Sequence, residues 1–173
     1  MDQAGVSFGR LSDVPKDQII AHMSDPVTVA HMPLAGMVWT DAVCAAFVAK
    51  KEACWDRDGL GHWAIFEDGR YIGWGGFQKE GEDWDFGLVL RPDAFGRGMA
   101  VTAKALDFAR ADPRIPSVTF LLPPSRMRLA ALRRIGAVEE GESVIEGTRF
   151  RRFRLMTPLG VRGAIKGGRM KAP

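Results

Sequence analysis

The chain has 173 residues, of which 46% are hydrophobic, so it has the size of one ordinary domain and can bury a substantial core. Its 24 lysines and arginines nearly balance its 21 aspartates and glutamates, so the net charge of +3 does not indicate a nucleic-acid partner. No basic segment followed by an apolar stretch opens the chain, and no window approaches the roughly 20 apolar residues of a membrane span. We therefore expect a soluble, cytoplasmic protein without a membrane partner.

The first third of the chain is predicted to be helical with irregular joints. Pro15 can begin a short helix that runs to Met23, and Thr40 can cap a longer helix that ends at the turn signal Asp58-Gly59. Cys44 and Cys54 both lie in this second helix, ten residues apart, which separates them by well over 10 Å at about 1.5 Å per residue. We therefore expect two reduced cysteines rather than a disulfide.

Three antiparallel strands are predicted next. "HWAIFED" and "GRYIGWGGF" are joined at Asp68-Gly69, a strong hairpin signal because both central positions of such a turn favour positive φ. A second turn over residues 79–83 leads into "WDFGLVLRP", in which apolar residues alternate with others.

The rest of the chain alternates helices and strands. We expect helices over 99–111 and 125–135, the second ending on Gly136, and strands over 117–122, 137–145 and 148–155. The chain as a whole is predicted to be α+β, with a mixed, mostly antiparallel twisted sheet of six to seven strands flanked by helices. Residues 1–156 are expected to form one domain, and the basic, glycine-rich residues 157–173 a flexible tail.

Two glycines, Gly96 and Gly98, lie at the joint between the third strand and the helix that follows it. Such a joint lets the main chain approach a ligand closely, and the free amides of the helix N-terminus favour phosphate. The G-x-G-x-x-G pattern is incomplete, because Val101 occupies its third glycine position. The P-loop pattern G-x-x-x-x-G-K-[ST] does not occur either. From these two residues alone, a simple tight turn is about equally favoured.

The surrounding residues carry a resemblance to a known family. "LVLRPDAFGRGMAVTAKALDFA" resembles the acetyl-coenzyme A signature of the GNAT superfamily of N-acetyltransferases, in which an apolar strand, a proline and three residues precede Gly-x-Gly-x-Gly/Ala. Pro92, Gly96, Gly98 and Ala100 match it, and "VTFLLPPSRMRLAALRRIGAVEEG" is similar to the second signature. The resemblance covers residues 7–155 and is strongest to the branch with ribosomal-protein N-terminal acetyltransferases.

The resemblance implies a set of residues for binding acetyl-coenzyme A. The main chain of Leu88, Val89 and Leu90 would pair with the pantetheine arm, and the amides that follow would hold the pyrophosphate, with added charge from Arg97. The full set of implied binding residues is Leu88, Val89, Leu90, Phe95, Gly96, Arg97, Gly98, Met99, Ala100, Val101 and Ser125.

Acetyl transfer to an amine requires a base, because a substrate ammonium must first lose a proton. Asp85 stands where many relatives carry a glutamate, and it is the favoured candidate; a solvated acidic hairpin is the alternative interpretation. An amide near Leu88 would stabilise the oxyanion. The usual tyrosine acid of the family is replaced by Leu132 and the usual asparagine by Ser125. Ser125 could protonate the leaving thiolate, or it could simply cap a helix.

The remaining polar and aromatic residues indicate less. His22, His31 and His62 do not have the spacing of metal ligands, so no metal is predicted. Trp74 and Trp84 are the candidates for an acceptor pocket, although a tryptophan is more often part of the core.

The predicted function is an N-acetyltransferase that moves an acetyl group from acetyl-coenzyme A, its cosubstrate, to a primary amine by direct attack in a ternary complex. The amine would belong to a small molecule or a protein N-terminus, and the enzyme could be a homodimer. One alternative is a non-catalytic module that senses acetyl-coenzyme A, motivated by the missing tyrosine and asparagine; another is an acyltransferase for a longer acyl chain. A nucleic-acid contact by the basic tail is a weaker possibility.

Overall fold

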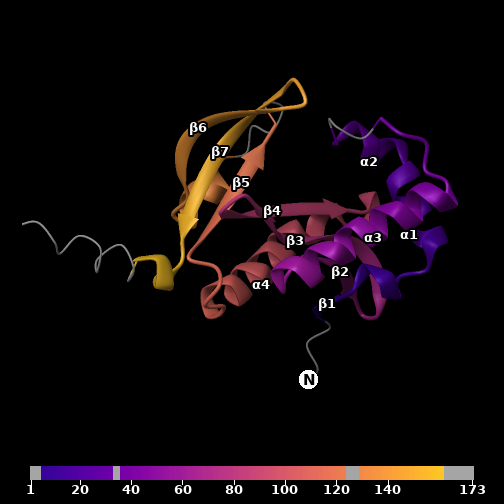
Figure 1. Cartoon of the computed structure of the whole chain (residues 1–173), viewed down its shortest axis with the longest axis horizontal. Helices are drawn as coiled ribbons and strands as arrows, with labels where there is room; N and C mark the ends of the chain where they lie inside the picture. The colour runs from indigo at the N-terminus through magenta and orange to yellow at the C-terminus, as the bar shows by residue number, and fades with distance from the viewer. Residues whose placement is uncertain (1–4, 33–35, 124–128, 162–173) are drawn as a thin grey trace, which may run out of the picture. The chain divides into compact units, whose positions relative to one another are not determined.

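The computed structural model describes residues 5–32, 36–123 and 129–161 (Figure 1). These residues form seven strands in the order β1-β2-β3-β4-β5-β7-β6. The strands are β1 (Val6–Gly9), β2 (His62–Glu67), β3 (Arg70–Glu80), β4 (Asp83–Leu90), β5 (Ser117–Leu122), β6 (Val138–Ile145) and β7 (Thr148–Met156). The helices are η1 (Leu11–Asp13), α1 (Lys16–Ser24), α2 (Pro26–Ala30), α3 (Asp41–Asp58), η2 (Pro92–Arg97), α4 (Gly98–Ala111) and α5 (Ala130–Arg134).

The sheet is mixed, because β4 pairs with β5 in parallel, whereas β1 with β2, β2 with β3, β5 with β7 and β6 with β7 pair antiparallel. This confirms the predicted α+β class. The described residues fall into two compact units, one within residues 1–79 and 87–104 and the other within residues 80–86 and 105–173. Strand β4 contributes its residues 83–86 to the second unit and 87–90 to the first.

The long helix of the first unit begins and ends where the sequence predicts. The Thr40 hydroxyl accepts a hydrogen bond from the Val43 amide at 3.2 Å, and Gly59 follows the helix with a φ of 70°. Cys44 lies fully buried in an apolar cluster with Ile19 of α1, and both cysteines are free thiols, as their spacing predicts.

The predicted hairpin between β2 and β3 is also confirmed. Asp68 and Gly69 have φ values of 51° and 77°, the pair of positive values that a two-residue turn of this kind requires. The second unit contains a similar turn at Glu146 and Gly147, with φ values of 48° and 77°, between β6 and β7 (Figure 1). The β6–β7 hairpin lies beside β5, which pairs with β7 from Ser117 to Leu122.

Two features of the fold differ from the predictions. Residues 6–9 form strand β1, paired with β2 from Val6 opposite Glu67, so the first third is not wholly helical. Four residues are too few to show a period by themselves. Helix α5 is shorter than the predicted 125–135 helix, and residues 124–128 lie outside the described part. Thr157, just after β7, is buried, and its amide donates to the Pro116 carbonyl at 3.1 Å. The flexible tail over 157–173 stays a prediction. Within the described ranges, no helix is long and apolar enough to cross a bilayer.

Candidate active site

The main chain near the end of β4 has one hydrogen-bonding edge directed away from β3. The Arg91 amide donates to the Ile72 carbonyl of β3 at 2.8 Å, and the Val89 carbonyl also faces β3, 2.4 Å from where a Cβ on Gly73 would lie. Because backbone groups of successive strand residues point to opposite edges, the amides and carbonyls of Leu88 and Leu90 point away from β3. Of the three residues predicted to pair with pantetheine, Leu88 and Leu90 have the required orientation and Val89 does not.

The glycine joint after β4 is formed by η2 and the first turn of α4. Gly98 has a helical φ of −53° and ψ of −41°, and Gly96 does not have a positive φ either. A Cβ on Gly96 would meet nothing within 4 Å, and one on Gly98 would make only an ordinary contact of 3.8 Å with Leu90. Neither the backbone nor the packing therefore requires glycine at these positions. Close approach of a ligand to the main chain is a physical reason for their lack of side chains.

The residues around these glycines leave the joint open on one side. Phe95 and Met99 are 44% and 66% exposed, and Ala100 is exposed as well, whereas Val101 is 1% exposed and packs into the core. The Arg97 Nε lies 2.5 Å from the Glu67 carboxylate, which holds the guanidinium in place and offsets part of its charge.

Asp85 is a half-buried carboxyl group on β4, opposite Thr119 of β5 in the parallel register. Its Oδ1 accepts a hydrogen bond from the Thr119 hydroxyl at 3.0 Å. Burial raises the pKa of Asp85 to about 7; the hydrogen bond from Thr119 opposes this shift and the nearby Glu80 adds to it. A carboxyl group with this pKa can exchange a proton near neutral pH.

The neighbouring acid Asp83 is held in its charged form. Its carboxylate pairs with Arg154 Nη1 at 2.8 Å and with Arg152 Nη2, and these two hydrogen bonds lower its pKa. The Arg154 guanidinium also donates to the Ser117 hydroxyl at 2.8 Å. Asp83 therefore contributes fixed negative charge, and Asp85 is the better candidate for a base.

The two tryptophans predicted to line an acceptor pocket lie in the packed interior. Trp74 is 7% exposed and its indole nitrogen donates to the Met23 sulfur at 3.2 Å; Trp84 is 5% exposed and its indole nitrogen donates to the Arg114 carbonyl at 2.9 Å. These contacts show core packing, and contact of either residue with an acceptor stays a prediction.

Two residues, Leu132 and Ser125, stand where the family usually has its tyrosine and asparagine. Neither provides a hydroxyl group among the residues that the structure describes. Ser125 lies outside the described residues, and Leu132 is half-buried on α5. Tyr71 is buried on β3, where its hydroxyl lies 3.0 Å from His22 Nδ1 and burial raises its pKa.

A polar cluster in the first unit was missed by the sequence analysis. The Lys51 Nζ lies 3.0 Å from His62 Nδ1 and 2.8 Å from Gln78 Oε1, and 5.0 Å from the ring centre of Trp74. The three polar side chains come from α3, β2 and β3. The fold brings these three elements together, and the spacing of Lys51, His62 and Gln78 in the sequence does not indicate their contact.

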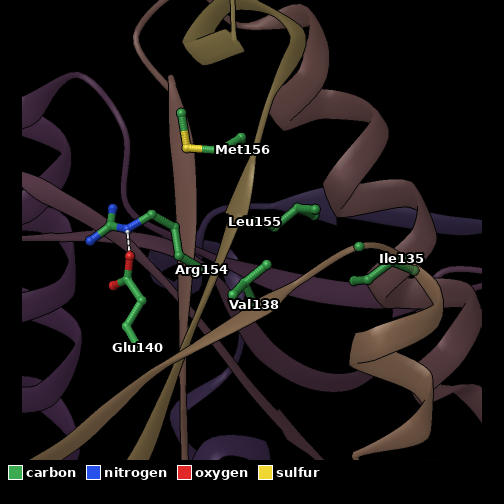
Figure 2. Close-up of a pocket in the computed structure, with 7 residues that line it drawn as sticks. Ile135, Val138, Glu140, Arg154, Leu155 and Met156 are labelled. Atoms are coloured by element: carbon green, nitrogen blue, oxygen red, sulfur yellow. Dashed lines mark hydrogen bonds and ion pairs between the residues drawn. The ribbon is translucent and has the colours of Figure 1, made fainter. Parts of the chain in front are cut away.

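Each of the two units has a surface pocket, and the pocket of the first unit includes Pro92 and Asp93 at the start of η2. One, of about 440 Å³, lies in the second unit between the end of α5 and the β6–β7 pair, and Figure 2 shows Glu140 paired with Arg154 at its wall. The other, of about 290 Å³, lies in the first unit and is lined by His22, Asp25 and Arg91. Neither contains a predicted site residue. The described residues also hold no group of three or more histidines, cysteines or acids that could bind a metal ion.

Comparisons with solved structures agree with this fold. An acetyltransferase from Agrobacterium tumefaciens is 18% identical with a TM-score of 0.68, over 88% of this chain and 91% of that one. RimJ from Mycobacterium smegmatis, solved with a coenzyme A disulfide, is 19% identical with a TM-score of 0.68, over 95% and 90%. RimL, a ribosomal L7/L12 α-N-protein acetyltransferase solved with coenzyme A, is 14% identical with a TM-score of 0.65, over 90% and 96%.

No curated protein sequence matches the chain. The model of the acetyltransferase (GNAT) domain, however, matches residues 10–137, which is well over half of the chain and contains β2 to β5 and the glycine joint. The chain therefore belongs to the GNAT acetyltransferase family.

Proposed function

We propose that the protein is an N-acetyltransferase that moves an acetyl group from acetyl-coenzyme A to a primary amine by direct attack. The observation that carries the proposal is the joint at Gly96 and Gly98, where side chains are missing although neither backbone nor packing requires it. Amides at the start of α4 would hold the pyrophosphate, with the positive end of the helix dipole directed at it.

The edge of β4 supports binding of the pantetheine arm. Leu88 and Leu90 direct their amides and carbonyls away from β3, and an extended ligand with amide groups can bond to such an edge as an added strand does. In this arrangement the Leu88 amide is the proposed main-chain donor for the acyl oxygen. The negative charge that develops on that oxygen would be stabilised by an N–H group that is already in place.

Asp85 supplies the base. It takes one proton from the substrate ammonium, and the neutral amine then attacks the thioester carbon, which breaks the C–S bond. The second proton lost by the nitrogen balances the one that converts the leaving thiolate to a thiol. Since a thiol with a pKa near 8.5 is a tolerable leaving group, an enzyme without the usual tyrosine can still turn over.

The acceptor is proposed to be a protein N-terminus or a small polyamine. The structural relatives include a ribosomal-protein α-N-acetyltransferase and a spermidine N-acetyltransferase chimera, the latter 14% identical with a TM-score of 0.65. Both kinds of acceptor present a primary amine, which Asp85 could deprotonate. We further predict that the protein forms a homodimer and is located in the cytoplasm.

Titration calorimetry with acetyl-coenzyme A and with coenzyme A is the first test, followed by release of free thiol with N-terminal peptides and polyamines. Micromolar binding with thiol release would support the transferase. Binding without thiol release for any amine would favour the sensing module, which the replacement of the usual tyrosine by Leu132 motivates. No binding at millimolar ligand would overturn the proposal.

A further inference from the structure

His62 lies on β2 with its ring directed over β4. Its Nε2 is 3.4 Å, and its Cε1 3.5 Å, from the position that a Cβ on Gly87 would occupy. Because Gly87 has no side chain, the edge of the imidazole ring faces the main chain directly before Leu88. The main chain of His62 is also fixed, because the Trp55 indole donates to the His62 carbonyl at 3.1 Å.

The Lys51 side chain determines which ring nitrogen of His62 carries the proton. An ammonium group has N–H donors and no acceptor, so His62 Nδ1, 3.0 Å from Lys51 Nζ, must be the acceptor in this contact. Burial, and then the positive charge of Lys51, lower the pKa of His62 well below its usual value, so the ring is neutral at pH 7. A neutral ring whose Nδ1 accepts carries its hydrogen on Nε2.

The lysine itself is firmly positioned for this role. Its Nζ donates to Gln78 Oε1 at 2.8 Å and lies over the rings of Trp74 and Phe47, at 5.0 and 5.8 Å from their centres. The cation is thus held by an amide oxygen and two aromatic faces, and it fixes the imidazole tautomer from behind.

His62 is only 7% exposed, and the Nε2 end of its ring lies over Gly87. Four buried side-chain atoms in the described residues have no hydrogen-bond partner, and His62 Nε2 is not among them. The only hydrogen bond of the His62 side chain among the described residues is the Nδ1 contact with Lys51. The Nε2–H therefore has no acceptor among the described residues and is directed over the main chain at Gly87. It cannot serve as a base, because it already carries its proton.

We propose that His62 donates its Nε2–H to the carbonyl oxygen of the acyl group as the amine attacks, as a second oxyanion donor beside the Leu88 amide. This inference rests on the proposed acetyltransferase function. It explains why a lysine is placed behind a buried histidine, since that lysine prevents Nε2 from becoming an acceptor. It also gives a reason for glycine at position 87, where a methyl group would cover the donor.

The test compares two variants of His62 that separate its two contacts. An asparagine carboxamide reaches the position of Nδ1 and can still accept from Lys51, whereas a glutamine carboxamide reaches the position of Nε2 and can donate an N–H there. His62→Asn is expected to lower kcat about 10²-fold, as the loss of one oxyanion donor does, and His62→Gln to recover most of that loss. Equal kcat for His62→Asn and the wild type, or equal losses in both variants, would overturn the inference.

A measurement on the wild-type protein keeps the test independent of how the variants fold. In ¹⁵N NMR of labelled histidine, His62 should carry its hydrogen on Nε2, and that resonance should move more with acetyl-coenzyme A than with coenzyme A, which has no acyl carbonyl. Equal shifts with both ligands would contradict the inference while leaving the transferase intact. If neither ligand binds, the proposed function itself fails.

Gly87→Ala is a second variant that acts on the same contact. Its methyl group would lie 3.4 Å from Nε2, which the fold can accept with a small adjustment, but it would occupy the space over the main chain. We expect kcat to fall at least tenfold, with the thermal midpoint within a few degrees of the wild type. A kcat equal to the wild type in a folded Gly87→Ala protein would count against His62 as a donor.

Discussion

The Asp85 carboxylate accepts a hydrogen bond of 3.0 Å from the Thr119 hydroxyl, and the two residues are paired across the parallel β4–β5 register. This contact opposes burial, which is the main cause of the raised pKa of Asp85. The balance of the two effects places that pKa at about 7, where a carboxyl group can accept a proton from an ammonium and release it to water. The predictions for the base follow from this balance.

The rate of acetyl transfer should depend on pH through Asp85. The base is active only when ionised, so kcat is expected to fall as the pH drops through about 7 and to level off above about 8. Asp85→Asn should lower kcat by about 10²–10⁴-fold and remove this limb of the profile, since an amide accepts no proton in this range. A variant with an unchanged pH profile would show that another group is the base.

The same pKa predicts an effect on stability. Because the pKa of Asp85 in the folded protein lies above that of an unfolded aspartate, the folded state binds the extra proton between about pH 4 and 7, and stability falls as the pH rises through this window. Asp85→Asn removes the cost of a buried charge, so its thermal midpoint should exceed that of the wild type at pH 8. At pH 4 the two midpoints should be similar. A lower midpoint at pH 8 would contradict the assigned burial of the charge.

Thr119 should determine the pH at which kcat falls on the acidic side of the pH profile. Thr119→Val keeps the shape of the side chain but removes the donor, so the pKa of Asp85 should rise and the limb of the kcat profile should move to higher pH. Thr119→Ser keeps the hydroxyl and serves as the matched control. Its limb should stay with that of the wild type, and a shift of equal size in both variants would indicate a packing effect instead.

The glycine joint can be tested by the smallest possible side chain. Gly96→Ala places a methyl group where no atom lies within 4 Å, so the fold should be kept, but the methyl would block close approach of a pyrophosphate to the main chain. We expect the Kd for coenzyme A to rise at least tenfold in calorimetry. Ala103→Val adds bulk at an exposed position later in α4 and should leave the Kd unchanged. Wild-type affinity in Gly96→Ala would show that the joint is only a turn.

Local signals in the sequence predicted the elements that position the site. Thr40 and Gly59 bound their helix and Asp68-Gly69 forms its hairpin, because caps and tight turns depend on residues close together in the chain. Asp85 was identified from the family resemblance, as the residue where many relatives carry a glutamate, but its raised pKa arises from burial by the fold. The contact between Lys51 and His62 joins a helix to a strand, and no periodicity in either segment indicates it.

The arginines of β7 should differ in their contribution to stability, depending on their partners. Arg154 is 22% exposed and bonds to Asp83, Ser117 and Glu140, whereas Arg149 is 69% exposed and, among the residues that the structure describes, pairs with Glu142 alone, at 3.3 Å. Arg154→Met should lower the free energy of unfolding by about 1–3 kcal/mol, because hydrogen bonds to a half-buried charge are lost. Arg149→Met should change it by no more than about 0.5 kcal/mol, as for most exposed pairs. Urea titration of both variants measures the difference, and equal effects would mean that the Asp83 network adds no more than a surface ion pair.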